Sequence, residues 1–179
     1  MRDISYRVAL GGIVSALCLV SMFLAGIMPA LYLVLPMIAG VLMMIIAVEV
    51  SISWALLTYI AVSLLSMLIC ADKEAALIFI MFFGHYPIIR FYLEKLRPKS
   101  FRFLVKMAVF NACIIMYYYI TVFVFGISEM VEDMGELGKY GTILFLVISN
   151  FIFVMHDLNL GMFYSYYRKK LMPRFRRKR

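Results

Sequence analysis

Six long apolar runs, joined by mostly short connections, constrain this chain more than any other feature of its sequence. A helix needs about 20 apolar residues to cross a hydrocarbon core of roughly 30 Å, and each run is close to that length. The runs cover residues 8–27, 30–48, 51–70, 75–91, 103–127 and 141–164. They predict an all-α polytopic membrane protein, a bundle of six transmembrane helices forming one integral membrane domain over residues 1–179.

Composition excludes the main alternatives. Of the 179 residues, 65% are hydrophobic and 16% are charged, whereas an average soluble domain is about half apolar and a quarter charged. A soluble domain of this size cannot bury so much apolar surface. Barrel strands are also excluded, because the runs are apolar on every face instead of alternating.

Basic residues are sorted to one side of the predicted bundle. The N-terminus, the connection around residues 90–106 and the tail after residue 164 hold 16 of the 18 lysines and arginines. The other side receives only Lys73 and Lys139, together with six acidic residues. By the positive-inside rule, both termini are expected to be cytoplasmic, with the chain in the plasma membrane. The formal charge of +8 is therefore assigned to topology and lipid contact, with residues 168–179 as a basic cytoplasmic tail, and no nucleic acid partner is expected.

No enzyme signature is present. The sequence lacks HExxH, GxSxG and phosphate-loop motifs. Cys18, Cys70 and Cys113 each stand alone in apolar sequence and are interpreted as small buried hydrophobes. We therefore expect no catalytic residues, no metal and no cofactor.

Ionisable groups inside a bilayer are costly and therefore informative. Arg90 and Asp157 both lie roughly 22–24 Å from the predicted outer face at 1.5 Å per residue. We predict that they pair, with Asn111 or Asn159 adding hydrogen bonds. The pair is either a switch or transport site, or a structural link between helices near the cytoplasmic interface.

His85 is predicted near the middle of the fourth span, just before Pro87. Proline should kink this helix and free a carbonyl near residue 83. The kink either shapes a ligand cavity that includes His85, or leaves a buried histidine bonded to a neighbouring helix.

Polar residues gather on the predicted outer side. Asp72 and Glu74 either begin the fourth helix, as a cap and a favourable charge at its positive end, or form a polar lid over an outward pocket. The acidic segment 128–140 is either a solvated connector or a gate. The candidate ligand-binding residues are Asp72, Lys73, Glu74, His85, Tyr118 and Glu129.

The first span carries two pairs of small residues, Gly11 with Ser15 and Gly12 with Ala16. Small residues four positions apart let another helix approach closely. Gly12 and Ala16 are the candidate docking face for a partner helix, and the alternative is packing within the same bundle.

Six short helices in about 180 residues, both termini inside and Gly12-xxx-Ala16 on the first helix resemble the substrate-binding S components of energy-coupling factor transporters. In that family the corresponding pair is of the Ala-xxx-Ala type, so Gly12 departs from it. The resemblance implies that a vitamin-like micronutrient binds in an outward pocket. It also implies that a transmembrane coupling subunit and separate cytoplasmic ATPases act as partners.

A second family has similar size and topology, the rod-shape-determining membrane proteins of cell-wall elongation. That likeness implies a non-catalytic membrane scaffold without transport. A transporter component predicts a polar pocket under residues 72–75 and 128–140, whereas a scaffold predicts none.

Overall fold

The computed structural model describes residues 4–126 and 140–172. Every regular element within these ranges is a helix, and no strand occurs in them, so the all-α prediction is confirmed for the described residues. The chain divides into two compact units, Met1–Val131 and Glu132–Arg179. Each is described by itself, and the expected single domain stays a prediction.

The described part of the first unit, residues 4–126, contains six α-helices and three short helical segments of other types. Its α-helices are α1 (Ile4–Ala25), α2 (Val34–Glu49), α3 (Ile52–Ile69), α4 (Lys73–Ile78), α5 (Tyr86–Leu93) and α6 (Lys99–Tyr119). The short segments are a 3₁₀ turn η1 (Pro29–Leu31) and two π-helical segments, η2 (Phe79–Phe83) and η3 (Ile120–Val124). The second unit contains α8 (Gly141–Tyr166), extended by the π-helical segment η5 (Tyr167–Leu171).

Among the described residues, five helices are long and apolar enough to cross a membrane: Ile4–Ala25, Ile52–Ile69, Lys73–Leu93, Lys99–Val124 and Gly141–Lys170. The second span was expected over residues 30–48, but the helix found there, α2, is shorter. It has 16 residues and a length of only about 24 Å. Pro36 explains its late start. Proline lacks the N–H that would bond to the Tyr32 carbonyl one turn earlier, so η1 and a turn at residues 32–33 precede α2.

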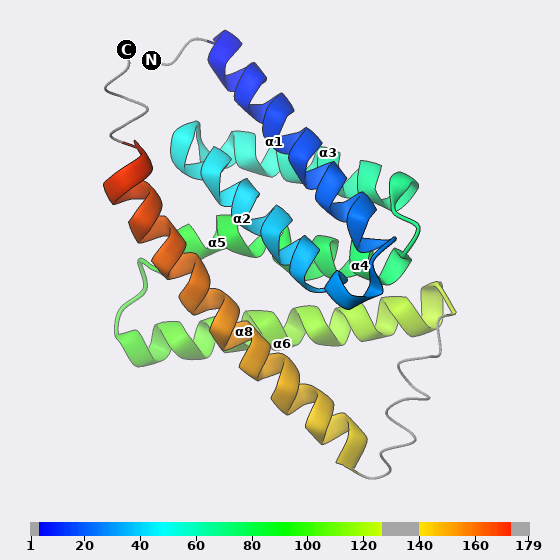
Figure 1. Ribbon diagram of the computed structural model, residues 1–179. Coiled ribbons are helices and arrows are strands. Elements are labelled where there is room, and N and C mark those ends of the chain that lie inside the picture. Colours follow the sequence, from blue (N-terminus) through cyan, green and yellow to red (C-terminus); the bar gives the residue numbers. More distant parts are fainter. Residues whose placement is uncertain (1–3, 127–139, 173–179) are drawn as a thin grey trace. The chain divides into compact units, whose positions relative to one another are not determined.

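Three helices of the first unit pack side by side. Helix α1 lies against α2 and α3, and α2 lies against α3 (Figure 1). Their contact faces are lined by small and flexible apolar side chains that are completely or almost completely buried, among them Cys18, Met22, Ala39, Met43 and Val62. Between α2 and α3 the chain turns sharply, and the Ser51 hydroxyl accepts a hydrogen bond from the Trp54 N–H at 3.3 Å to begin α3.

The predicted break in the fourth span is present. Pro87 lies in the first turn of α5, and η2 widens the helix just before it, with the Gly84 N–H donating to the Phe79 carbonyl at 2.7 Å. The Phe83 carbonyl, four residues before Pro87, lies against Gly40 of α2 so closely that a Cβ at Gly40 would collide with it. Gly40 therefore allows α2 to pack directly on the kinked backbone.

The helices of the first unit share two ends. The end of α1 and the α3–α4 connection meet at one end, where the Cys70 thiol donates to the Met22 carbonyl at 3.1 Å. A Cβ at Gly26 would lie 3.0 Å from the backbone nitrogens of Ala71 and Asp72. We name this the predicted outer end. The opposite end, where α5 finishes and α6 begins, is the predicted inner end.

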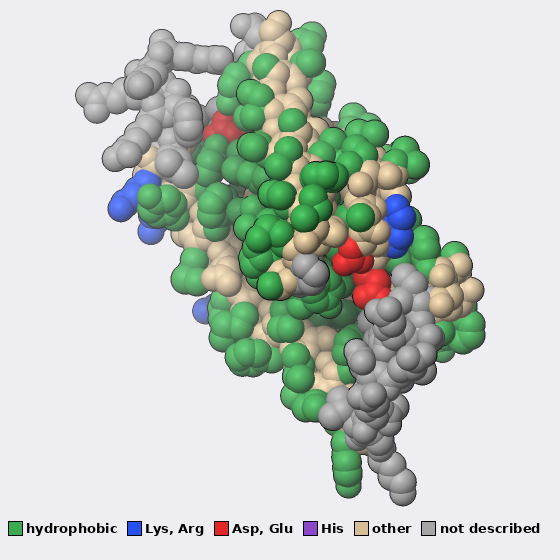
Figure 2. All heavy atoms as spheres, turned by 45° about the vertical axis from the view of Figure 1, so that its right-hand side comes forward, with side chains coloured by type: hydrophobic (Ala, Val, Ile, Leu, Met, Phe, Trp, Pro, Cys, Tyr) green, Lys and Arg blue, Asp and Glu red, His purple; other side chains and the backbone are tan. Residues whose placement is uncertain are grey.

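The outside of the helices is apolar. Large hydrophobic side chains such as Leu57, Leu68 and Phe123 are 63%, 80% and 74% exposed. Hydrophobic groups cover most of the described surface on the face drawn in Figure 2, and charged groups gather in small clusters. Such surfaces are typical of helices that lie in lipid.

Candidate functional site

Asp72 and Lys73 join two helices at the predicted outer end. The Asp72 carboxylate accepts hydrogen bonds from the N–H groups of Glu74 and Ala75 at 2.9 and 3.2 Å, which caps α4. The Lys73 ammonium donates to the Met67 and Cys70 carbonyls at 2.8 and 2.9 Å, which satisfies the end of α3. The capping interpretation of Asp72 is confirmed, and Lys73 acts as a donor at the end of the preceding helix.

Glu74 and two tyrosines form a cluster next to these caps. Tyr32 comes from the connection between α1 and α2, and its pKa is raised by burial and by the negative charges of Glu74 and Asp72. Tyr117, on α6, lies within electrostatic range of Glu74 and Tyr32. One carboxylate oxygen of Glu74 is inaccessible to solvent. Three separate segments thus bring polar groups together at the outer end.

Two hydroxyls in this cluster are buried with their hydrogen-bonding capacity unfilled. Tyr117 and Thr121 are 4% and 0% exposed. The two hydroxyls are neighbours one turn apart and close enough to interact with each other, but neither reaches hydrogen-bond geometry with any described residue. A buried hydroxyl without a partner costs roughly 1–3 kcal/mol, so this is the arrangement expected where a ligand supplies the missing groups.

The structure places Tyr117, and not the candidate Tyr118, in the outer cluster. Tyr118 is half-buried and its ring packs against Tyr119, whereas Tyr117 is buried in the outer cluster. A sequence signal for this exists, because Lys106, Phe110, Tyr117 and Thr121 recur at helical spacing and all four are buried. Glu129, the remaining outer candidate, lies outside the described residues.

His85 belongs to a separate polar cluster at the helix break. Its Nδ1 lies 3.2 Å from the Ile80 carbonyl and therefore carries the proton, since a carbonyl only accepts. The Tyr59 hydroxyl donates to the same carbonyl at 2.7 Å. The Cys113 thiol lies 3.9 Å from His85 Nε2, which is then left to accept. These contacts link α3 and α6 to the widened turn.

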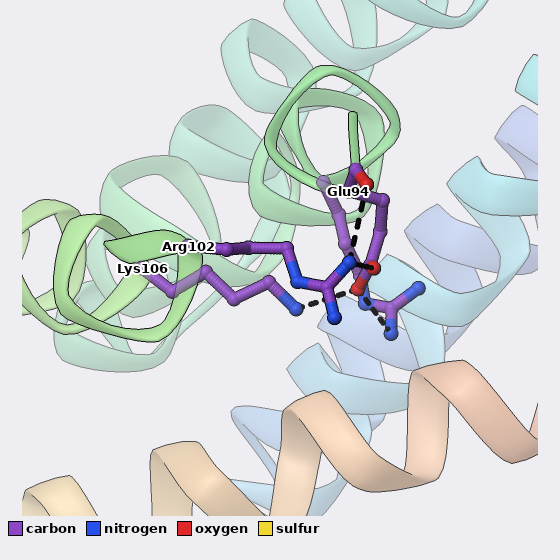
Figure 3. A network of polar contacts seen from close by, with 4 residues as sticks. Glu94, Arg102 and Lys106 are labelled. Carbon is purple, nitrogen blue, oxygen red and sulfur yellow. Dashed lines mark hydrogen bonds and ion pairs between the residues drawn. The ribbon is translucent and has the colours of Figure 1, made fainter. Parts of the chain in front are cut away.

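Arg90 takes part in a charge cluster that was not expected. The carboxylate of Glu94 lies 3.0 Å from Arg90, one turn earlier, and 2.9 and 2.7 Å from Arg102 and Lys106 of α6. Arg102 also donates to the Glu94 backbone carbonyl at 3.2 Å. Figure 3 shows Arg102 and Lys106 reaching side by side from one helix toward Glu94.

The environment of Glu94 favours its ionised form. Burial alone would raise its pKa, but the hydrogen bond from Lys106 and the charges of Arg90, Lys106 and Arg102 outweigh this effect and hold the pKa below its ordinary value. The signal for this cluster was present in the spacing, since Glu94 follows Arg90 by four residues.

Two residues predicted to interact with Arg90, Asp157 and Asn111, lie on other helices. Asp157 lies on α8 in the second unit, so the pairing of Arg90 with Asp157 stays a prediction. Asn111, on α6, donates to the Met107 carbonyl of its own helix at 2.8 Å.

The small residues of α1 divide between two faces. Gly11 is buried and faces Thr58 of α3, whereas Gly12 and Ala16 are exposed, and a Cβ at Gly12 would meet nothing within 4 Å. Gly12 and Ala16 are thus accessible to another helix, as a docking face requires.

No group of three or more metal-binding side chains occurs among the residues that the structure describes. Cys18, Cys70 and Cys113 are free, and the Cys18 thiol donates to the Ala39 carbonyl at 3.5 Å. Comparison of the chain with protein-family models, with curated proteins and with solved structures finds no match.

Proposed function

We propose that this chain is the membrane-embedded capture component of an importer, similar in role to the S components of energy-coupling factor transporters. It binds a small water-soluble ligand, vitamin-like in size, at the predicted outer end. Separate ATPases and a transmembrane coupling subunit supply the energy and the pathway. The chain resides in the plasma membrane with both termini in the cytoplasm.

The observation that carries the proposal is the pair of buried hydroxyls at Tyr117 and Thr121. Both are enclosed by protein and neither completes a hydrogen bond within the described residues. Buried polar groups are normally satisfied, and an exception calls for an explanation. A ligand that accepts and donates hydrogen bonds provides one.

Charge narrows the ligand class. Glu74 and Asp72 lie close enough to Tyr32 to raise its pKa, so the cluster carries a negative potential. A neutral or cationic ligand is therefore favoured over an anionic one. Tyrosine rings at the same place suit a flat, partly apolar ligand.

The coupling subunit would dock on α1. Gly12 and Ala16 are exposed, and the neighbouring Ile13 and Leu17 are 60% and 48% exposed. A flat strip of small residues flanked by apolar side chains is a typical contact face between membrane helices.

Ligand screening by thermal shift tests the proposal. Full-length protein in non-ionic detergent is heated with each of a panel of water-soluble vitamins and related amines. One chemical class is expected to raise Tm, because a ligand at 100 times its Kd stabilises the folded state by about 2.7 kcal/mol. The Tyr117→Phe and Glu74→Gln variants should each need at least ten times more ligand to reach the same increase in Tm.

Tyr119→Phe is the matched control, since Tyr119 is on the same helix but is 56% exposed. It should bind as the unaltered protein does. A panel in which no compound shifts Tm, or in which Tyr119→Phe and Tyr117→Phe lose binding equally, would reject capture at this site. The first result would leave the scaffold as the better alternative.

A further inference from the structure

The beginning of α6 at the predicted inner end carries a concentration of positive charge. Between residues 90 and 106 there are six basic residues and one acidic residue. Arg90, Arg102 and Lys106 all contact that single carboxylate, Glu94. Lys95, Arg97 and Lys99 are exposed around it. We name these seven residues the inner basic corner.

The local sequence works against the helix that begins there. The N-terminus of a helix carries a partial positive charge and favours acidic side chains. Helix α6 has none in its first turn and no side-chain cap, and Lys99 and Arg102 lie there instead. Cations at the positive end of a helix repel it, so an anion is expected to offset the repulsion.

Arg102 has donors to offer to such an anion. A guanidinium has five N–H groups, and the contacts of Arg102 with Glu94 both leave from Nη1. In Figure 3 another terminal nitrogen of Arg102 carries no dashed line to the residues drawn. The Arg102 side chain is 27% exposed, so an anion can approach this edge from outside. Arginine presents a planar fork that matches phosphate oxygens.

The surroundings favour an anion with an apolar part. Phe101, Phe103 and Leu104, which flank Arg102 on α6, are 50%, 51% and 64% exposed. Nearby Tyr92 is also exposed, with the Lys95 ammonium over its ring at 5.3 Å. Cations beside exposed aromatic and aliphatic groups are typical of the headgroup level of a membrane.

We propose that the inner basic corner binds the phosphodiester of an anionic phospholipid. Arg102 and Lys99 hold the phosphate, Glu94 keeps Arg90, Arg102 and Lys106 gathered on one side of it, and Phe101 and Leu104 contact the acyl chains. The site rests on the membrane setting of the proposed function but not on ligand capture at the outer end.

Native mass spectrometry of the full-length protein in non-ionic detergent tests this site. The protein is titrated with short-chain phosphatidylglycerol, with phosphatidylcholine of the same chain length and with inorganic phosphate. Phosphatidylglycerol is expected to bind at least tenfold more tightly than the other two. Equal binding of phosphatidylcholine would overturn the role of charge, and equal binding of inorganic phosphate would overturn the assignment to a lipid.

Variants separate a built site from general attraction. Lys99→Gln changes an exposed residue and should leave folding intact. Arg102→Gln removes the guanidinium that is proposed to hold the phosphate. Each variant should bind phosphatidylglycerol at least fivefold more weakly. Lys169→Gln, which removes an exposed lysine on η5, is the charge-matched control and should change binding less than twofold. Equal losses in Lys99→Gln and Lys169→Gln would reduce the effect to nonspecific electrostatics and overturn the site. Vitamin binding in the thermal-shift screen would be unaffected by either outcome.

Discussion

The two ends of the first unit handle buried polar groups in opposite ways. At the inner end, Glu94 is contacted by three cations at 2.7 to 3.0 Å, and its ionised form is stabilised. At the outer end, the Tyr117 and Thr121 hydroxyls are more deeply buried and complete no hydrogen bond within the described residues. The same helix, α6, contributes to both ends. The inner cluster therefore links α5 to α6 through satisfied contacts, whereas the outer hydroxyls are the groups to which we propose that a captured ligand binds.

The comparison assumes that both ends belong to one well-packed unit. Substitution of Gly40 tests this assumption and has the largest expected effect on stability. Gly40→Ala places a Cβ against the Phe83 carbonyl, a backbone atom that cannot move aside. We expect a loss of about 2–3 kcal/mol, since inserted atoms in a packed core cost that much. Thermal unfolding in detergent measures it, and Gly12→Ala, where nothing lies within 4 Å, is the control. Similar Tm values for the two variants would contradict the close packing.

Glu94→Gln probes the inner end. The substitution removes the negative charge that three cations contact, and losing one partner of a buried ion pair is costly. Because the Glu94 side chain is 34% exposed, we discount the effect to about 1–2 kcal/mol. Chemical denaturation at neutral pH measures the change. A variant as stable as the unaltered protein would show that the cluster does not hold α5 and α6 together.

The pH dependence of stability gives a second measure of the same group. The pKa of Glu94 is lower in the folded protein than its ordinary value of 4.5, so folding favours the ionised form. Its contribution is fully present well above pH 4.5 and is lost as the pH falls through the folded value. Glu94→Gln should therefore flatten the acid side of the stability profile. If the stability of this variant falls at low pH as steeply as that of the unaltered protein, groups other than Glu94 cause the loss.

Asp72→Ala separates capping from ligand binding at the outer end. The variant loses two hydrogen bonds to the start of α4 and should be less stable by about 1 kcal/mol. If Asp72 only caps the helix, the ligand found in the screen should still bind within threefold of its usual affinity. Complete loss of binding with unchanged stability would move Asp72 into the ligand site.

Tyr117→Phe has the smallest expected effect on stability, and the direction of that effect tests the comparison most directly. Tyr117→Phe removes a buried hydroxyl that lacks a partner, so the ligand-free protein should become more stable by up to about 1 kcal/mol. Thermal unfolding without ligand measures it, with Tyr119→Phe as a neutral control. A destabilised Tyr117→Phe would mean that this hydroxyl is satisfied in the free protein, and the contrast between the two ends would disappear.

Much of the helical architecture follows from sequence alone. Apolar length predicts six spans, and five of them correspond to helices of the described residues that are long and apolar enough to cross a membrane. Pro87 predicts the break in the Lys73–Leu93 span. Asp72 as a cap also follows from a local rule. These features depend on residues within a few positions of one another, so a one-dimensional pattern contains them.

The composition of each cluster was decided only by tertiary structure. Glu94 meets Arg102 and Lys106 because α5 and α6 turn back on each other. Tyr32, Glu74 and Tyr117 meet although the first and the last are 85 positions apart in the sequence. Which of three successive tyrosines points inward depends on how α6 is rotated against its neighbours, and apolar composition on all sides leaves that rotation open. Sequence by itself therefore determined that this chain forms long apolar helices and where one of them bends. Packing alone decided which polar groups meet between them, because burial in a bundle depends on contacts between segments distant in the chain.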